Sequence, residues 1–585
     1  MGIRKIEFKG KEGFYLNGEA YHDKLIGANR HQDYGYVGNA LPNSGQWRDV
    51  KKLRDAGMRI IRCAHYPQDP AFMDACDELG MFIIVATPGW QFWNDQPIFQ
   101  KRVYNDIRNM VRRDRNHPSV IMWEPILNET KYPDYFAKQV HEIVHEEYPW
   151  QRAYTVCDGH AKGHEHFDVN YKHPVKGECW SNTVEATVKN YKKSLGDYSK
   201  EKKSVFTREW GDNVDDWSSH NSTSRVSRGW GETPQLIQAL QYAGTSMVYT
   251  SFEGLYLSPR QHVGGTLWHS FDHQRGYHPD TFFGGIMDVF RQPKYSYYLF
   301  MSQRDPNIKL EKAESGPMIY TAHELSPFSP KDITVFTNCD EVRMILLEKD
   351  TLIQKVDKKN HFMPHPPVVF KDAYDFMDMK KLQRKHKLSQ ANIVVEGLIG
   401  GKVVVREVKR PAKRVSKLMI ELDNEKVALE ADGSDFVTLI VSLVDEDGYV
   451  KRLNNYSVRI EIEGEGKLLG GRENGANPVK LEWGTAPILV QSTTKTGAIK
   501  VKAHLQWEGI NTPISGEFTF NSIKSPMKSI YSETPTKGKR TTINQQNSKE
   551  DIQSLKRKLL EMQQKLNQIR LEKVSKQQEQ FENKE

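Results

Sequence analysis

Two glutamates, Glu129 and Glu209, are the candidate catalytic residues of this sequence. Glu129 closes the stretch Trp123-Glu-Pro-Ile-Leu-Asn-Glu-Thr130, and Glu209 lies inside Phe206-Thr-Arg-Glu-Trp-Gly211. Each ends or closely follows a short apolar run that is typical of a buried strand. Two carboxylates that meet in one cleft are what glycosidic-bond hydrolysis requires, because one protonates the leaving oxygen and the other attacks the anomeric carbon. For either residue alone, a solvated surface carboxylate is the alternative.

A repeat of strands and helices must position these carboxylates. Short apolar runs alternate with helix-period segments from about residue 24 to residue 300. The predicted strands are 24–28, 58–62, 82–87, 120–124, 154–157, 168–171, 204–208 and 265–269. The predicted helices include 45–56, 70–79, 99–113, 135–147 and 234–251. Eight such units favour a TIM (β/α)8 barrel, an α/β fold.

Active residues of such a barrel sit at the C-terminal ends of its strands. Glu129 follows predicted strand four and Glu209 follows predicted strand seven, so both are expected at one mouth. An open doubly wound sheet is the competing fold, but no Gly-rich phosphate loop follows the first strand.

The barrel is one of several predicted domains. We expect residues 1–23 to form a strand that enters it and residues 24–305 to form the barrel itself. Short alternating strands then predict two immunoglobulin-like β-sandwich domains, at 306–411 and 412–523.

The last part of the chain has a different composition. Residues 524–550 resemble a disordered linker. Residues 551–585 carry apolar side chains at spacings of three and four, which predicts a helical tail, either a coiled coil that supports a homo-oligomer or a solvated helix. Residues 524–585 hold 14 Lys/Arg and 8 Asp/Glu, so this end supplies most of the net charge of +8.

Composition excludes several other classes of protein. Outside residues 524–585, the sequence shows no pattern of basic and aromatic residues that is typical of nucleic-acid binding. The cysteines, five in number, have no C-x-x-C spacing, which argues against a zinc site and a disulfide framework. No apolar run is nearly as long as a membrane-spanning helix requires. The first residues alternate like a strand instead of resembling a signal peptide, so the sequence does not indicate the cellular compartment.

Several ordered motifs resemble one known family. They are Gly27-Ala-Asn-Arg-His-Gln-Asp33, Arg62-Cys-Ala-His-Tyr-Pro67, Arg113-Asp-Arg-Asn-His-Pro-Ser-Val-Ile-Met-Trp123 leading into Asn128-Glu129, and Gly265-Thr-Leu-Trp268. Together they resemble glycoside hydrolase family 2, which contains β-galactosidases and β-glucuronidases. The resemblance implies a retaining mechanism, with Glu129 as general acid/base and Glu209 as nucleophile. It also implies a jelly-roll and a sandwich before the barrel, whereas we expect this sequence to begin at the strand that enters the barrel.

Further side chains are candidates for substrate contact. Asn128 is placed to hydrogen-bond a sugar 2-hydroxyl, and Arg62 to hold Glu209 ionised by charge pairing. The resemblance implies that His31 and His65 contact sugar hydroxyls. Trp268, at the end of strand eight, is suited to stack on a sugar face.

Two residues depart from the family pattern. Glu124 is an additional carboxylate at the end of strand four and is the alternative to Glu129 as the acid. Glu129 is preferred because Asn128 directly precedes it. Asp212 stands where β-galactosidases of the family often have a histidine near the sugar 6-position, which weakens a strict galactose assignment.

These observations predict an exo-acting, retaining β-glycosidase that is most similar to β-galactosidases and acts on oligosaccharides. A β-glucuronidase, or a galactosidase for algal-type galactans, is the enzymatic alternative. A degenerate carbohydrate-binding or scaffold protein is the alternative from another class. The sequence requires no cofactor, although some relatives take Mg²⁺ or Na⁺.

Overall fold

In the computed structural model, the described residues are 3–149, 153–174, 200–211, 222–244, 250–274 and 281–526, with isolated positions at 186–198 and 557–568. Met1–Pro526 form one compact unit and Met527–Glu585 a second. Most of the predicted helical tail and nearly all of the predicted linker lie outside the described residues, and so does Asp212.

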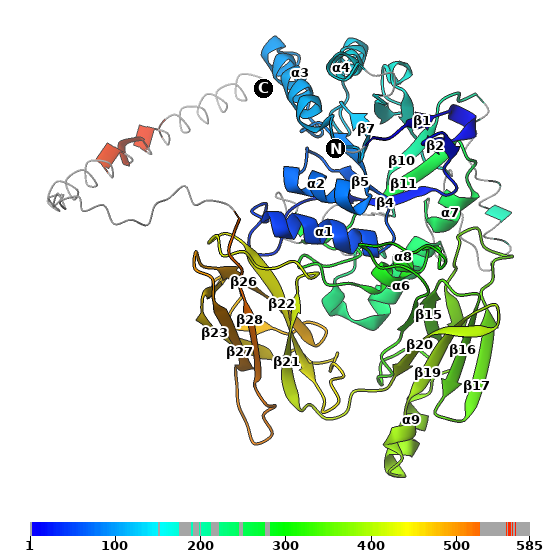
Figure 1. Cartoon of the computed structure of the whole chain (residues 1–585), viewed down its shortest axis with the longest axis vertical. Helices are drawn as coiled ribbons and strands as arrows, with labels where there is room; N and C mark the ends of the chain where they lie inside the picture. The colour runs from blue at the N-terminus through cyan, green and yellow to red at the C-terminus, as the bar shows by residue number, and fades with distance from the viewer. Residues whose placement is uncertain are drawn as a thin grey trace, which may run out of the picture. The chain divides into compact units, whose positions relative to one another are not determined.

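Eight parallel strands form a barrel (Figure 1). They are β4 (Leu25–Arg30), β5 (Ile60–Cys63), β6 (Phe82–Ala86), β7 (Val120–Glu124), β8 (Val156–Asp158), β9 (Val169–Tyr171), β10 (Val205–Trp210) and β11 (His262–Leu267). The sheet runs in the order β7-β6-β5-β4-β11-β10-β9-β8, and a parallel bridge between Trp123 and Thr155 joins its two ends. The predicted TIM barrel is therefore confirmed. Because helices and packed side chains cover both faces of the strands, their sequences read as continuous apolar runs.

Helices follow the strands as the repeat predicts. They are α1 (Asn43–Asp55), α2 (Pro70–Leu79), α3 (Pro97–Asp114), α4 (Asp134–Glu147), α6 (Glu232–Ala243), α7 (Phe252–Leu257) and α8 (Tyr295–Met301). Helix α2 begins at Pro70, where the carboxylate of Asp69 accepts a hydrogen bond from the Ala71 N–H, and ends before Gly80 in the left-handed conformation. None of the described helices is long and apolar enough to cross a membrane.

A small antiparallel sheet precedes the barrel where we expected a single strand. It consists of β1 (Ile6–Phe8), β2 (Phe14–Leu16) and β3 (Glu19–Ala20). Ile6 and Phe14 are buried in one cluster with Leu25, Ile60 and other strand residues of the barrel. The N-terminal segment thus closes the end of the barrel at which the parallel strands begin.

Two modules of antiparallel strands follow, drawn from green to brown in Figure 1. The first has sheets β14-β15-β18 and β17-β16-β19-β20, and the second has sheets β21-β22-β26-β24 and β25-β23-β27-β28. The strands of the first module are β14 (Ile319–Ala322), β15 (Ile333–Thr337), β16 (Glu341–Leu346), β17 (Asp350–Lys355), β18 (Val368–Phe370), β19 (Ile393–Ile399) and β20 (Lys402–Lys409), and helix α9 (Phe376–Arg384) lies between β18 and β19. Those of the second are β21 (Lys417–Asp423), β22 (Phe436–Val444), β23 (Ser457–Gly464), β24 (Gly466–Leu468), β25 (Val479–Lys480), β26 (Thr485–Ser492), β27 (Ala498–Leu505) and β28 (Gly516–Asn521). Each module has its own apolar core, as a two-sheet sandwich requires.

Candidate active site

Arg62, the third residue of β5, connects the candidate catalytic groups. Its guanidinium is fully buried and donates to Glu209 Oε1 at 2.9 Å and to Asn128 Oδ1 at 3.0 Å. It also donates to both carboxylate oxygens of Glu124, each at 2.5 Å, and to Asn29 Oδ1 at 2.8 Å. Such a fork of charge-assisted hydrogen bonds fixes the acceptors in a single arrangement. The ion pair expected between Arg62 and Glu209 is present in the structure.

Glu124 differs from the other two glutamates in its burial. Its side chain is only 1% exposed, whereas those of Glu209 and Glu129 are 23% and 32% exposed. Besides the two bonds from Arg62, Glu124 accepts a hydrogen bond from the Tyr171 hydroxyl at 2.7 Å. Glu124 is therefore a buried counter-ion for Arg62, and the competing assignment of this carboxylate as the proton donor loses its support.

A bulge in β10 places two consecutive side chains at the mouth. Between Thr207 and Trp210 the strand has one more residue than the matching part of β11. Side chains normally alternate between the two faces of a strand, but a bulge re-aims them. Arg208 and Glu209 consequently both reach the site, since Glu209 contacts Arg62 and Arg208 contacts Glu129.

Glu209 lies in a mixed electrostatic environment. Burial raises the pKa of its carboxyl group, the positive charges of Arg208 and Arg62 act to lower it, and the carboxylate of Glu129 acts to raise it again. The net pKa lies above the ordinary value for glutamate. Since the charge of Glu129 acts on the pKa of Glu209, the two carboxylates belong to one site.

Glu129 lies in a loop that is held against the segment after β6. The Asn128 N–H donates to Gly89 O at 3.1 Å and the Gln91 N–H donates to Asn128 O at 2.9 Å. The Gln91 side-chain amide donates to Glu129 Oε2 at 2.7 Å. The backbone of Glu129 has φ of 50°, a left-handed conformation that is uncommon for residues other than glycine.

Arg208 is a site residue that the sequence analysis missed. Its guanidinium, 16% exposed, donates to Asn128 Oδ1 and lies 3.5 Å from Glu129 Oε1 and 3.3 Å from an oxygen of Asp158. The signal was its position immediately before Glu209, but regular alternation would have turned it away from the mouth.

Aromatic rings form another wall of the site. The rings of His65 and Trp268 stack at 5.3 Å, and the rings of His31 and His273 stack at 4.2 Å. Trp90 lies parallel to His65 at 6.4 Å and is 39% exposed. Burial lowers the pKa of His31 to about 4, with further lowering by the charges of Arg62 and Arg30, so its imidazole is neutral near pH 7. The structure thus brings together all the predicted site residues that it describes.

Comparison with family models decides which family this is. Residues 6–149 match the TIM barrel domain of glycosyl hydrolases family 2, and residues 420–507 match C-terminal domain 5 of the same family. The chain belongs to glycoside hydrolase family 2. The family assignment suggested by the ordered motifs is therefore confirmed.

Individual family 2 relatives span a range of activities. A β-galactosidase of Thermoanaerobacter pseudethanolicus is 30% identical over 532 residues, an alignment of 88% of this chain and 64% of the relative. A solved family 2 member from Bacteroides cellulosilyticus shares the fold with a TM-score of 0.62 at 21% identity, covering 90% of this chain and 65% of that one. A β-glucuronidase of Parabacteroides merdae does so with a TM-score of 0.52 at 20% identity, covering 90% and 64%. This chain thus spans less than two thirds of the length of these relatives.

Proposed function

We propose that this family 2 chain is a retaining exo-β-glycosidase that removes β-linked sugars from the non-reducing end of oligosaccharides, with a β-galactoside as its preferred substrate. The observation that carries the proposal is the pair of half-buried glutamates, one bound to Arg62 and the other in a loop beside Asn128, at the mouth of the barrel. The relationship to a β-galactosidase supports the choice of sugar.

In the first step, the Glu209 carboxylate attacks the anomeric carbon while Glu129 protonates the departing glycosidic oxygen. The bond to the leaving group breaks and an ester between the sugar and Glu209 forms. In the second step, Glu129, now ionised, takes a proton from a water molecule that attacks the same carbon. The sugar departs, Glu209 is a carboxylate again and Glu129 is protonated, so the cycle closes.

Asn128 is proposed to present a hydrogen-bond donor to the sugar. Its Oδ1 accepts from both Arg62 and Arg208, because an amide oxygen has two lone pairs and arginine only donates. Nδ2 lies 3.5 Å from His65 Nε2, and because an amide nitrogen carries two hydrogens, the second is proposed to face a sugar hydroxyl. A contact to the 2-hydroxyl strengthens as positive charge develops at the anomeric carbon.

A β-glucuronidase activity is the second candidate, and the guanidinium of Arg208 favours it. This cation lies at the mouth, where the carboxylate of a uronic acid would bring a negative charge. In the structure, however, Arg208 already contacts Asn128, Glu129 and Asp158, so we rank the neutral sugar first.

A panel of nitrophenyl β-glycosides, including the galactoside, glucoside and glucuronide, tests the proposal. We expect the highest kcat/KM on the galactoside, and preference for the glucuronide would support the second candidate. The Glu129→Gln variant should lose roughly 10²–10⁴-fold on a substrate with a poor leaving group and far less on an activated aryl glycoside, because only the former needs a proton donor. If no glycoside is cleaved although sugars bind, the chain is instead a carbohydrate-binding protein.

A further inference from the structure

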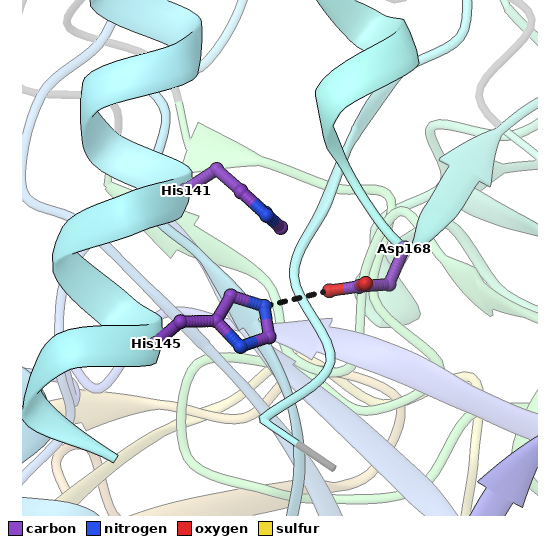
Figure 2. Close-up of side chains that lie close together, drawn as sticks. All are labelled: His141, His145 and Asp168. Atoms are coloured by element: carbon purple, nitrogen blue, oxygen red, sulfur yellow. Dashed lines mark hydrogen bonds and ion pairs between the residues drawn. The ribbon is translucent and has the colours of Figure 1, made fainter. Parts of the chain in front are cut away.

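Three potential metal ligands meet on the side of the barrel remote from Glu129 and Glu209. His141 and His145 lie four positions apart in the sequence, so they share one face of α4, and Asp168 immediately precedes β9 (Figure 2). One ligand atom from each residue lies within 4.8 Å of the other two. All three side chains are partly exposed, which leaves a path for an ion from solvent.

The contact between His145 and Asp168, drawn as a dashed line in Figure 2, is a long hydrogen bond whose length also equals the spacing of two ligands of one ion. His145 Nε2 and Asp168 Oδ2 are 3.3 Å apart. A charge-assisted N–H···O bond is shorter, about 2.7–2.9 Å. Two ligands at about 2.0–2.1 Å from a tetrahedral zinc ion are separated by roughly 3.3–3.4 Å, the edge of the tetrahedron. The two side chains are thus already spaced as two ligands of one ion.

Hydrogen bonds with Thr155 orient the side chains of Asp168 and His141. The Thr155 N–H and its hydroxyl both donate to Asp168 Oδ2 at 2.8 Å. His141 Nδ1 lies 2.8 Å from the same hydroxyl oxygen. Because that hydroxyl already donates to Asp168, His141 Nδ1 must donate to it, and the lone pair of this imidazole is on Nε2. Partners of this kind orient ligands around metal ions in proteins.

The ligand types select the ion. Two imidazoles and a carboxylate suit zinc, whereas Mg²⁺ and Ca²⁺ prefer sites made of oxygen. A second group in the described part of the chain, Asp134, Glu165 and His166, has two exposed carboxylates and one imidazole, a weaker match to zinc.

We propose that His141, His145 and Asp168 bind a zinc ion that fastens α4 to the start of β9. Water completes the coordination. Asp168 precedes β9, and Thr155 precedes β8, so the site lies at the N-terminal ends of the strands. The glutamates lie at the opposite ends, and the ion is therefore structural and takes no part in glycoside hydrolysis.

Calorimetric titration of the chelator-treated chain with ZnCl₂, and with MgCl₂ in parallel, tests this proposal. We expect one zinc ion to bind with micromolar or tighter affinity, to raise the thermal unfolding midpoint and to leave the glycosidase rate unchanged, while Mg²⁺ has no effect. Co²⁺ in the same site should give the visible absorption of a tetrahedral complex. The calorimetric, thermal and spectroscopic readouts are independent of whether the proposed glycosidase activity exists.

Variants locate the ion. His145→Ala should weaken zinc binding by more than about 100-fold and abolish the cobalt spectrum. Asp168→Asn keeps an oxygen acceptor for Thr155 and should therefore fold normally, yet it should also weaken zinc binding. A loss of zinc affinity in this variant is thus not explained by misfolding. The control is His117→Ala, because His117 Nδ1 lies 2.7 Å from Asp77 Oδ2 as a pair outside either three-residue group. Equal zinc affinity in all three variants, or no stoichiometric binding by the unmodified chain, would overturn the proposal.

Discussion

The side chains at the two ends of the barrel are charged at one end and apolar at the other. At the C-terminal ends of the strands, Arg62, Glu124 and Glu209 form a network of charges in and beside the core. At the N-terminal ends, Ile6 and Phe14 of the small leading sheet pack on apolar strand residues. The first arrangement fixes the position of Glu209, the proposed nucleophile, and the second contributes stability through buried apolar area. Substitutions at the two ends should accordingly affect different measurements.

The largest effect is expected from Glu209→Ala, which removes the proposed nucleophile. The rate on a nitrophenyl galactoside should fall by about 10⁴-fold or more, because no group remains to form the ester. Added azide should restore turnover and yield the α-glycosyl azide, which nuclear magnetic resonance of the product identifies. Thermal unfolding should change little. A loss below about tenfold, or rescue with a β-configured product, would exclude this role.

Next in size is Arg62→Met, which should harm both activity and stability. It leaves the carboxylate of Glu124 buried with only the Tyr171 hydroxyl as a described partner. An uncompensated buried charge costs about 3–5 kcal/mol, to be measured by urea unfolding. Arg112→Met is the matched control, since the side chain of Arg112 is 56% exposed and its partner Glu147 keeps Arg108 as a second cation, so the loss should be small. Equal destabilisation by the two variants would contradict the difference between a buried and an exposed arginine.

At the opposite end, Ile6→Ala should affect stability alone. Ile6 is 2% exposed, and truncation of a buried isoleucine typically costs about 2–5 kcal/mol. The small leading sheet has room to relax, so a value near the lower limit is expected. Below the unfolding transition, kcat/KM should match that of the unmodified chain. A change in KM at full folding would show that the two ends are coupled.

The smallest expected effect concerns pH. Glu209 must be ionised to attack, and burial raises its pKa, so the acid limb of kcat/KM should lie above pH 4.5, the ordinary value for this group. Arg208 is the largest contribution that lowers this pKa. Arg208→Met should therefore move the acid limb to higher pH, whereas Arg208→Lys should keep it nearer its original position. An unchanged limb in the methionine variant would mean that another group controls it.

Repeated patterns made much of the barrel predictable. Strand β7 and helix α2 have the predicted bounds, because apolar runs and capping residues mark both ends. The eighth strand was placed three residues too late, since it begins at His262, a polar residue that is buried and lies 2.8 Å from Thr207 Oγ1. Periodicity cannot signal a buried histidine whose partner is on another strand.

Motifs in the sequence predicted Glu129, Glu209, Arg62 and Asn128 as site residues. The structure places them near one another, since Arg62 contacts Glu209 and Asn128 and Arg208 contacts Glu129, while their roles in catalysis stay predictions. Arg208 was missed because its position depends on a bulge between two strands, and the sequence of one strand does not reveal its register with another. The histidines of α4 were overlooked because Asp168 is distant from them in the chain.

The left-handed backbone conformation of Glu129 affects the stability of the folded protein. Only glycine adopts such a conformation without steric cost, which for other residues is about 1–2 kcal/mol. Glu129→Gly should therefore yield a protein that is at least as resistant to unfolding but cannot protonate a leaving group. If Glu129 is the proton donor that we propose, a screen for thermal resistance alone would select against catalysis at this position, which is a trade-off between stability and activity.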